Sequence, residues 1–173
     1  MSRHLVLALA ACCVACSTTQ VTRVILVRHA EKATGGGKDP DLSEAGRARA
    51  ERLARMAHEA DVAAVFATQF KRTQQTVAPV AEARGLSVVP VDAGDAAGLV
   101  RRILADHAGK VVLVAAHSNS VPAIIAALGG PTMAELADDA FDDLFVITTD
   151  GHARGPDSAG HTAVVHLRYD RAD

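Results

Sequence analysis

Short runs of apolar residues alternate with amphipathic segments along the chain from about residue 21 onward. The apolar runs are typical of buried strands, whereas the amphipathic segments carry apolar residues at the spacing of one helix face. Strands that alternate with helices predict a three-layer α/β/α sandwich with a mostly parallel central sheet, in a single domain over 21–173. The expected strands are 24–27, 61–67, 88–91, 111–116, 144–149 and 162–169.

Four helices are expected between these strands, and several have a recognisable start or stop signal. They are 41–57, 72–84, 96–107 and a last helix that begins near Ser120, which we expect to cap it. Asp41 and Glu44 fit a capping box at the start of the first helix. Gly85 ends the second helix, and Pro122 falls in the first turn of the last one, where its missing N–H is harmless.

The side-chain pattern also predicts which positions face the interior. In the first helix we expect four residues to face the core: Leu42, Ala45, Leu53 and Met56. Four basic residues of that helix are expected to face water: Arg47, Arg49, Arg52 and Arg55. Pro90 cannot donate to a sheet ladder, so the strand 88–91 is expected at an edge of the sheet or Pro90 at a strand end.

The first twenty residues have the pattern of a secretory signal and a tether, and they are set apart from the fold. Their apolar run, 5–11, is too short to span a bilayer, since a spanning helix needs about 20 apolar residues. All three cysteines lie in this segment, and their positions resemble a bacterial lipoprotein signal, in which a cysteine after small residues is lipidated. Cys16, which leads into a polar tether, and Cys12 are both candidates. A disulfide or a core position is the alternative.

Composition and charge limit the classes of binding partner that we expect. The chain has a formal net charge of -2, one tyrosine, no tryptophan and no long basic block, so we expect no nucleic-acid partner. The signal-like segment predicts a periplasmic location in the cell envelope, with membrane contact only through the lipid anchor. His152, His161 and His166 have no cysteine nearby and do not have the spacing of a typical metal site, so no metal and no cofactor is expected. The oligomeric state stays open.

The candidate catalytic residues follow two apolar strands, at the point where each strand ends. Arg28 and His29 follow the run 24–27, and His117 follows the run 111–116. Open α/β sheets bind ligands at the carboxyl ends of their strands, so the two histidines can meet although they are far apart in the sequence. A phosphoryl group has several charged oxygens that need several cationic donors at once, and Arg28 and Arg72 are candidate donors. These residues indicate phosphoryl transfer through histidine.

Three motifs, in order along the chain, resemble those of the histidine phosphatase superfamily, which also contains cofactor-dependent phosphoglycerate mutase. Residues 28–31, Arg-His-Ala-Glu, are similar to the family's Arg-His-Gly-Glu, and 42–47 resembles the segment that follows it. Residues 68–76 resemble Ser-x-Leu-x-Arg-Ala-x-Gln-Thr, and 117–119, His-Ser-Asn, follows an alanine where the family has glycine. The likeness covers roughly 21–149 and implies the phosphoglycerate mutase-like fold.

The resemblance implies a role for each motif residue. His29 is the expected nucleophile, which forms a phosphohistidine that water then cleaves. Arg28 and Arg72 are expected to hold the phosphate, and their charges to keep His29 unprotonated. His117 is expected to donate a hydrogen bond to a phosphoryl oxygen. Two further residues are candidate substrate ligands: Asn119, which would orient water or phosphate, and Glu31, which would hold Arg28 or Arg72 or lie in a solvated loop.

The general acid is the least defined part of the site. Family members that act on phosphate monoesters usually supply a carboxylate after the third strand, and Asp92 and Asp95 lie at that place here. The longer insertion that carries the acid in the family is absent. If neither carboxylate reaches the pocket, a phosphoramidate such as phosphohistidine becomes the favoured substrate, although phosphohistidine proteins are mostly cytoplasmic.

The expected function is hydrolysis of a small phosphate ester through phospho-His29, without a metal. One alternative is a phosphohistidine or phosphoramidate phosphatase, and another is an envelope lipoprotein that binds phosphate without turnover. A structural envelope protein is a third, and a mutase is disfavoured because the chain is short. One acidic cluster is expected to be a solvated face: Asp138, Asp139, Asp142 and Asp143.

Overall fold

A six-stranded sheet forms the centre of the protein in a computed structural model that describes residues 20–151 and 161–169. In spatial order the strands are β3 (Val88–Val91), β2 (Val62–Thr68), β4 (Val111–Ala116), β1 (Thr22–Arg28), β5 (Asp143–Thr149) and β6 (Thr162–Arg168). The first four are parallel to one another, and the last two run antiparallel to their neighbours. The predicted mostly parallel sheet is confirmed, and β3 with its Pro90 is an edge strand as expected.

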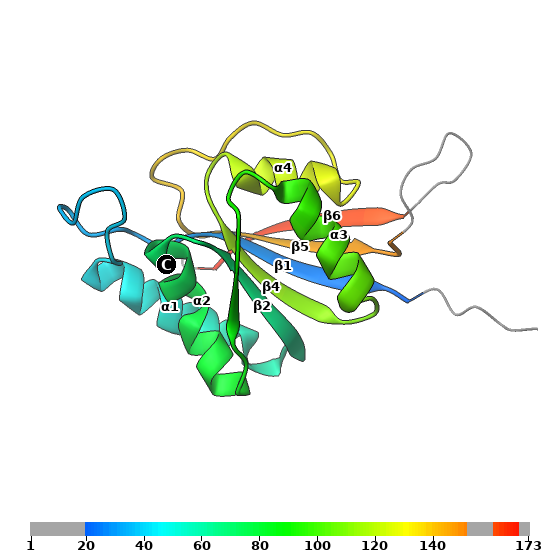
Figure 1. Cartoon of the computed structure of the whole chain (residues 1–173), viewed down its shortest axis with the longest axis horizontal. Coiled ribbons are helices and arrows are strands. Elements are labelled where there is room, and N and C mark those ends of the chain that lie inside the picture. Colours follow the sequence, from blue (N-terminus) through cyan, green and yellow to red (C-terminus); the bar gives the residue numbers. More distant parts are fainter. Residues whose placement is uncertain (1–19, 152–160, 170–173) are drawn as a thin grey trace, which may run out of the picture.

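Helices cover both faces of this sheet, as the three-layer prediction requires (Figure 1). On one face, residues of α1 (Glu44–Met56) and α2 (Lys71–Arg84) pack against the strands. On the other face, α3 (Ala96–Asp106) and α4 (Ser120–Ala127) pack against a second apolar cluster. A short 3₁₀ helix, η1 (Ala57–Glu59), follows α1. The strands between the two layers are therefore apolar on both faces, which explains their continuous hydrophobic runs.

Strand register determines where the site lies. β1 pairs with β4 so that Arg28 is opposite Ala116, and β4 pairs with β2 so that Ala115 is opposite Ala67. The three strands therefore end together at one edge of the sheet. His29 and His117, and the turn from β2 into α2, consequently lie next to one another at that edge.

Two expected helix caps are wrong. The N-cap of α1 is Ser43, whose Oγ accepts a hydrogen bond from the Gly46 N–H at 3.0 Å. Asp41 lies outside the helix, and its carboxylate accepts from Gln75 Nε2 at 2.9 Å. Ser120 does not cap α4 either, because its Oγ accepts from the backbone N–H of His117 at 2.9 Å. Asp41 thus joins the segment before α1 to α2, whereas Ser120 closes the turn between His117 and α4.

The inward face of α1 also differs from the prediction. Leu42 and Leu53 are buried as expected. Ala45 is exposed and Met56 is 49% exposed, and Gly46 and Ala50 are buried instead of them. Alanines occur on every side of this helix, so the apolar pattern does not define one face. Of the four arginines expected to face water, Arg47 and Arg55 are exposed, whereas Arg52 is half-buried and the side chain of Arg49 is only 12% exposed.

Some predictions from the sequence concern residues that the structure does not describe. Cys12 and Cys16 of the lipoprotein-type signal lie outside the described residues, as does His152. Within 20–151 and 161–169, no helix has the length and apolar character needed to cross a membrane.

Candidate active site

His29 is held at the end of β1 in a single orientation. Its backbone N–H donates to Ala116 O at 2.9 Å, which extends the β1–β4 ladder by one residue. Its ring Nδ1 lies 2.8 Å from Ala30 O. A carbonyl oxygen can only accept, so Nδ1 carries the proton and Nε2 keeps its lone pair. The lone pair on Nε2 makes this imidazole a competent nucleophile.

Arg28 has an unexpected set of partners. Its Nη1 donates to Ala137 O at 2.6 Å and to Asp138 O at 3.0 Å, with Ala140 O at 3.3 Å. Its guanidinium also lies over the Phe141 ring, 4.4 Å from the ring centroid. Burial lowers the pKa of Arg28, while the charges of nearby carboxylates, Asp138 first, raise it. Arg28 therefore holds the segment 137–141 over the site while remaining a cation.

His117 is the end of a chain of hydrogen bonds. Its Nε2 lies 2.9 Å from Thr68 Oγ1, which lies 2.8 Å from Thr73 Oγ1, and Thr73 donates to Phe70 O at 2.7 Å. The hydroxyl proton of Thr73 is used in its bond to Phe70 O, so Thr73 Oγ1 accepts the hydrogen bond from Thr68. Thr68 Oγ1 in turn accepts from His117 Nε2, which therefore carries a proton. Nδ1 is then the nitrogen on the side of Arg72, whose Nη2 is 3.5 Å away.

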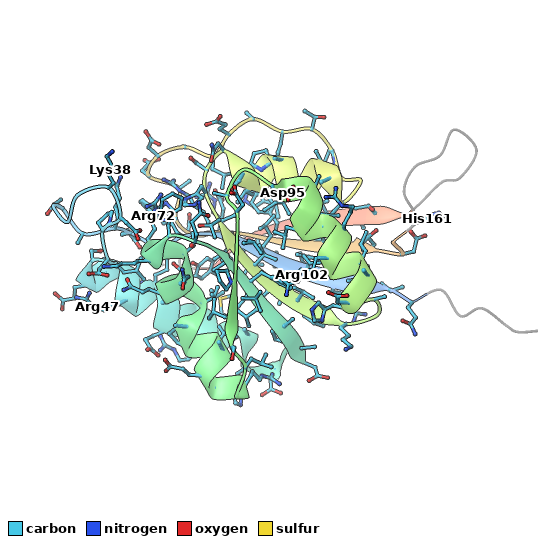
Figure 2. The ribbon with its side chains drawn as sticks, viewed as in Figure 1. Lys38, Arg47, Arg72, Asp95, Arg102 and His161 are labelled. Atoms are coloured by element: carbon cyan, nitrogen blue, oxygen red, sulfur yellow. The ribbon has the colours of Figure 1, made fainter. Side chains whose placement is uncertain are left out.

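Arg72 lies in the first turn of α2 with its side chain 16% exposed. Its Nη1 is 3.8 Å from an oxygen of Asp39, and its guanidinium lies 4.5 Å from the centroid of Phe70. Figure 2 shows Arg72 beside the edge of the sheet where the parallel strands end. A cation at a helix N-terminus opposes the helix dipole, so Arg72 is best placed there when an anion binds at the same point.

The two histidines are close and poorly hydrated. Their ring centroids are 5.3 Å apart in an edge-to-face arrangement. Burial, more than the nearby arginines, lowers the pKa of His29 to about 4, although its bond to Ala30 O acts in the opposite direction. Burial and then Arg72 lower the pKa of His117 to about 4. Both rings are therefore neutral at pH 7 in the unliganded protein.

A cavity of about 780 Å³ opens at this edge of the sheet. It is lined by Arg28, His29, Lys32, Phe70, Arg72, Ala93, Gly94, His117, Ser118, Asn119, Glu135, Asp138 and Phe141. The four residues proposed from the sequence as the catalytic set thus share one cavity. Asn119, at the start of α4, also lines it. The cavity is large enough for a phosphoryl group together with part of its leaving group.

The other candidate residues from the sequence do not line the cavity. Glu31 forms a two-pronged ion pair with Arg49, with contacts of 2.7 and 2.9 Å, instead of holding Arg28 or Arg72. Asp92 accepts from Gly94 N at 2.7 Å, and Asp95 caps α3 by accepting from Gly98 N at 2.7 Å. Figure 2 shows Asp95 at the start of α3. Both aspartates therefore bind the backbone of their own turn.

Sequence reasoning missed several residues of the cavity. Lys32 adds a third cation, and Glu135 and Asp138 add two carboxylates. Asp138 had been expected only as part of a solvated face. The segment between Gly130 and β5 has no helix or strand pattern in the sequence, so nothing marked it as part of the site. Thr68 and Thr73 lie within the second motif, but their role in holding His117 depends on side-chain geometry.

Two further histidines, His161 and His166, lie at the hairpin of β5 and β6 and form contacts outside the cavity. His166 Nε2 lies 2.7 Å from an oxygen of Asp143, and His161 Nδ1 lies 3.7 Å from an oxygen of Asp150. In the part of the chain that the structure describes, no group of three or more histidine, cysteine or acidic residues is arranged to hold a metal ion.

A family model described as the histidine phosphatase superfamily (branch 1) matches residues 24–93, which include His29 and Arg72. Over this stretch, the chain is similar to the histidine phosphatase superfamily. It is also 36% identical over 78 residues to phosphoserine phosphatase 1 of Hydrogenobacter thermophilus. That match spans 42% of this chain and 37% of the relative, so it covers little more than a third of the relative's length.

Solved structures of other proteins share the fold over most of this chain. The mycobacterial glucosyl-3-phosphoglycerate phosphatase in complex with VO3 has a TM-score of 0.62 at 16% identity, covering 86% of this chain and 99% of that one. YhfR of Bacillus stearothermophilus has a TM-score of 0.62 at 20% identity, over 83% and 96%. A protein of Agrobacterium tumefaciens that carries the name of the phosphohistidine phosphatase SixA has 0.59 at 22%, over 87% and 99%.

Two alanines replace the glycines of the family motifs without filling the cavity. Ala30 is fully buried and packs with Leu42 and Ala50. Ala116 is also fully buried and belongs to the core beneath α3 and α4. Neither residue is among those that line the cavity. Both methyl groups therefore point into packing, and the room for a phosphoryl group is unaffected.

Proposed function

We propose that this protein is a histidine phosphatase that hydrolyses a small phosphate monoester through a phosphohistidine on His29. The observation that carries the proposal is the bond from His29 Nδ1–H to Ala30 O, which leaves the Nε2 lone pair available in a cavity that also holds two guanidinium groups. Binding of phosphate alone requires the cations but not a neutral imidazole held in one tautomer. This favours an enzyme over a phosphate-binding protein.

In the first step, His29 Nε2 attacks phosphorus while the bond from phosphorus to the leaving oxygen breaks. In the second, water attacks the phosphohistidine, the P–N bond breaks and inorganic phosphate is released. Arg72 and Arg28 bind the phosphoryl oxygens during both steps. The Arg28 Nε atom is buried and has no hydrogen-bond partner among the described residues. An unpaired buried donor is costly, so this atom favours a site that an anion completes.

His117 acts electrostatically in this proposal. Its Nε2–H is engaged with Thr68, so a hydrogen bond to a phosphoryl oxygen requires a proton on Nδ1. A bound phosphate dianion raises the pKa of an adjacent imidazole, because it stabilises the charged form. His117 therefore takes up a proton when substrate binds, and its charge offsets the negative charge that develops in the transition state.

The names of the relatives support a monoester as the substrate class, since phosphoserine and glucosyl-3-phosphoglycerate are both phosphate esters. One observation favours a second candidate, a phosphoramidate such as phosphohistidine: Asp92 and Asp95 bind their own backbone, so neither is placed to protonate an alcohol leaving group. Location in the cell envelope through lipidation at Cys16 or Cys12 remains part of the proposal.

The test is turnover of p-nitrophenyl phosphate in excess chelator by the wild-type protein and by His29→Ala. We expect turnover that survives the chelator and falls by at least about 10³-fold in the variant. Activity that is lost in chelator and restored by added metal would contradict the metal-independent mechanism. If phosphate binds but a panel of phosphate esters and phosphoramidates stays intact, the protein is a binding protein.

A further inference from the structure

An alkyl phosphate cannot lose its alcohol at a useful rate unless the leaving oxygen receives a proton. Among the described residues that line the cavity, the only carboxylates are those of Glu135 and Asp138. Both come from the segment between α4 and β5, rather than from the turn after β3. The carboxylates at the turn after β3 are bound to backbone N–H groups of that turn.

The residues that directly follow Glu135 are held at two points of the site. The next residue, Leu136, donates its backbone N–H to Ser118 O at 3.1 Å, directly beside His117, and its side chain packs on the core. One and two residues after Leu136, the carbonyls of Ala137 and Asp138 accept hydrogen bonds from Arg28. The segment that begins at Glu135 is therefore held next to both His117 and Arg28, and Glu135 itself lines the cavity, even though this segment has no helix or strand.

The two carboxylates differ in their surroundings. The charge of Asp138 is the first of the carboxylates that raise the pKa of Arg28, followed by those of Asp139 and Asp143. Asp138 thus serves as a counter-ion of Arg28. Glu135 is not one of these counter-ions. A phosphate dianion in the cavity repels a carboxylate at the rim, and proton uptake by that carboxylate removes the repulsion.

We propose that Glu135 is the general acid of this enzyme. As His29 Nε2 forms its bond to phosphorus, the Glu135 carboxyl gives its proton to the leaving oxygen, so that the P–O bond breaks and a neutral alcohol departs. The resulting Glu135 carboxylate then takes a proton from the water that attacks the phosphohistidine. The P–N bond breaks, inorganic phosphate forms and the carboxyl is regenerated. This inference rests on the proposed phosphatase function.

The test compares two substrates whose leaving groups differ in how much they depend on protonation by a general acid. p-Nitrophenol leaves readily as an anion, whereas ethanol in ethyl phosphate does not. In Glu135→Gln we expect kcat/KM for ethyl phosphate to fall by about 10²- to 10⁴-fold, while kcat/KM for p-nitrophenyl phosphate changes by less than about threefold. Glu51→Gln, at an exposed position of α1, is the matched control and leaves both values unchanged.

Asp92→Asn tests the rival position of the acid. A loss in Asp92→Asn that is selective for ethyl phosphate, or an equal loss on both substrates in Glu135→Gln, would overturn the assignment of Glu135 while leaving the phosphatase function in place. A wild-type protein that hydrolyses neither ester would overturn the proposed function itself, and with it this inference. Glu135 is exposed, so Glu135→Gln is expected to fold, which an unchanged melting temperature verifies.

Discussion

At the scale of single residues, the chemistry depends on which nitrogen of each histidine holds a proton. Hydrogen bonds to Ala30 O and Thr68 Oγ1 set the two tautomers. The sequence placed both histidines at strand ends, because the apolar runs before them are unmistakable. It could not reveal the tautomers, since these depend on partners that lie elsewhere in the chain. Both rings are buried in this arrangement, and burial disfavours their protonated forms.

The pKa values of these rings can be measured directly. Burial lowers the pKa of both His29 and His117 to about 4 from an ordinary value of 6.5. In the unliganded protein, the ring signals of both residues in NMR spectra recorded against pH are therefore expected to shift near pH 4 and to stay constant from pH 6 to 8. His29→Ala identifies one set of signals. A midpoint between pH 6 and 7 for either ring would contradict the account.

The same shifts predict how stability depends on pH. Between about pH 4 and 6.5 the unfolded chain binds protons at these positions and the folded protein does not, so the free energy of unfolding rises with pH over that window. Each unit of pKa difference is worth about 1.4 kcal/mol, so the loss on acidification from pH 7 to 4 is of the order of several kcal/mol for the pair. Urea unfolding at the two pH values measures it. A smaller loss in His29→Ala is expected, and an identical loss would exclude His29 as a contributor.

At the scale of secondary-structure elements, the second motif joins α2 to the loops around it. Thr76 Oγ1 accepts from Ala30 N at 2.9 Å, and Gln75 Oε1 accepts from Leu42 N at 2.8 Å. The sequence indicated the elements well, because their apolar patterns are local. It placed Leu53 of α1 correctly but not Ala45 and Met56, because alanines on several sides of this helix blur the pattern. It also missed the role of 131–142, a segment that Arg28 and Ser118 hold in place without any periodic pattern.

The contact between α1 and the loop after β1 explains the glycine in the segment 42–47. A Cβ on Gly46 would lie 2.2 Å from the backbone oxygen of Glu31, which a small shift cannot relieve. Gly46→Ala is therefore expected to lower the free energy of unfolding by about 1–3 kcal/mol, although alanine favours helices by about 1 kcal/mol over glycine. Ala45→Gly, one residue away and exposed, isolates the helix propensity. A melting temperature raised by Gly46→Ala would contradict this packing.

At the scale of the whole molecule, the site exists because three parallel strands end together. β1, β4 and β2 bring His29, His117 and Arg72 to one edge of the sheet, and the segment before β5 closes the cavity. The alternation of strands and helices predicted this sheet, and strand ends predicted the core of the site. The carboxylates of the cavity could not be predicted, because Glu135 reaches it only through bonds between distant segments.

Phosphate binding is expected to stabilise the whole fold. A ligand that binds only the folded protein adds about 2.7 kcal/mol to the free energy of unfolding at 100 times its Kd. Inorganic phosphate at that excess should therefore raise the melting temperature of the wild-type protein in calorimetry, and at the same concentration should raise that of Arg72→Gln much less. An equal rise in both proteins would mean that phosphate binds elsewhere.

The most direct measurement of the central claim is capture of the phosphorylated enzyme. The protein is mixed with ³²P-labelled phenyl phosphate, quenched in alkali within milliseconds to seconds, digested and mapped by mass spectrometry, with His29→Ala treated in parallel. The account predicts one label, stable in alkali and lost in acid, on the peptide that contains His29, and no label in the variant. Turnover without a labelled peptide, or a label on another residue, would contradict it.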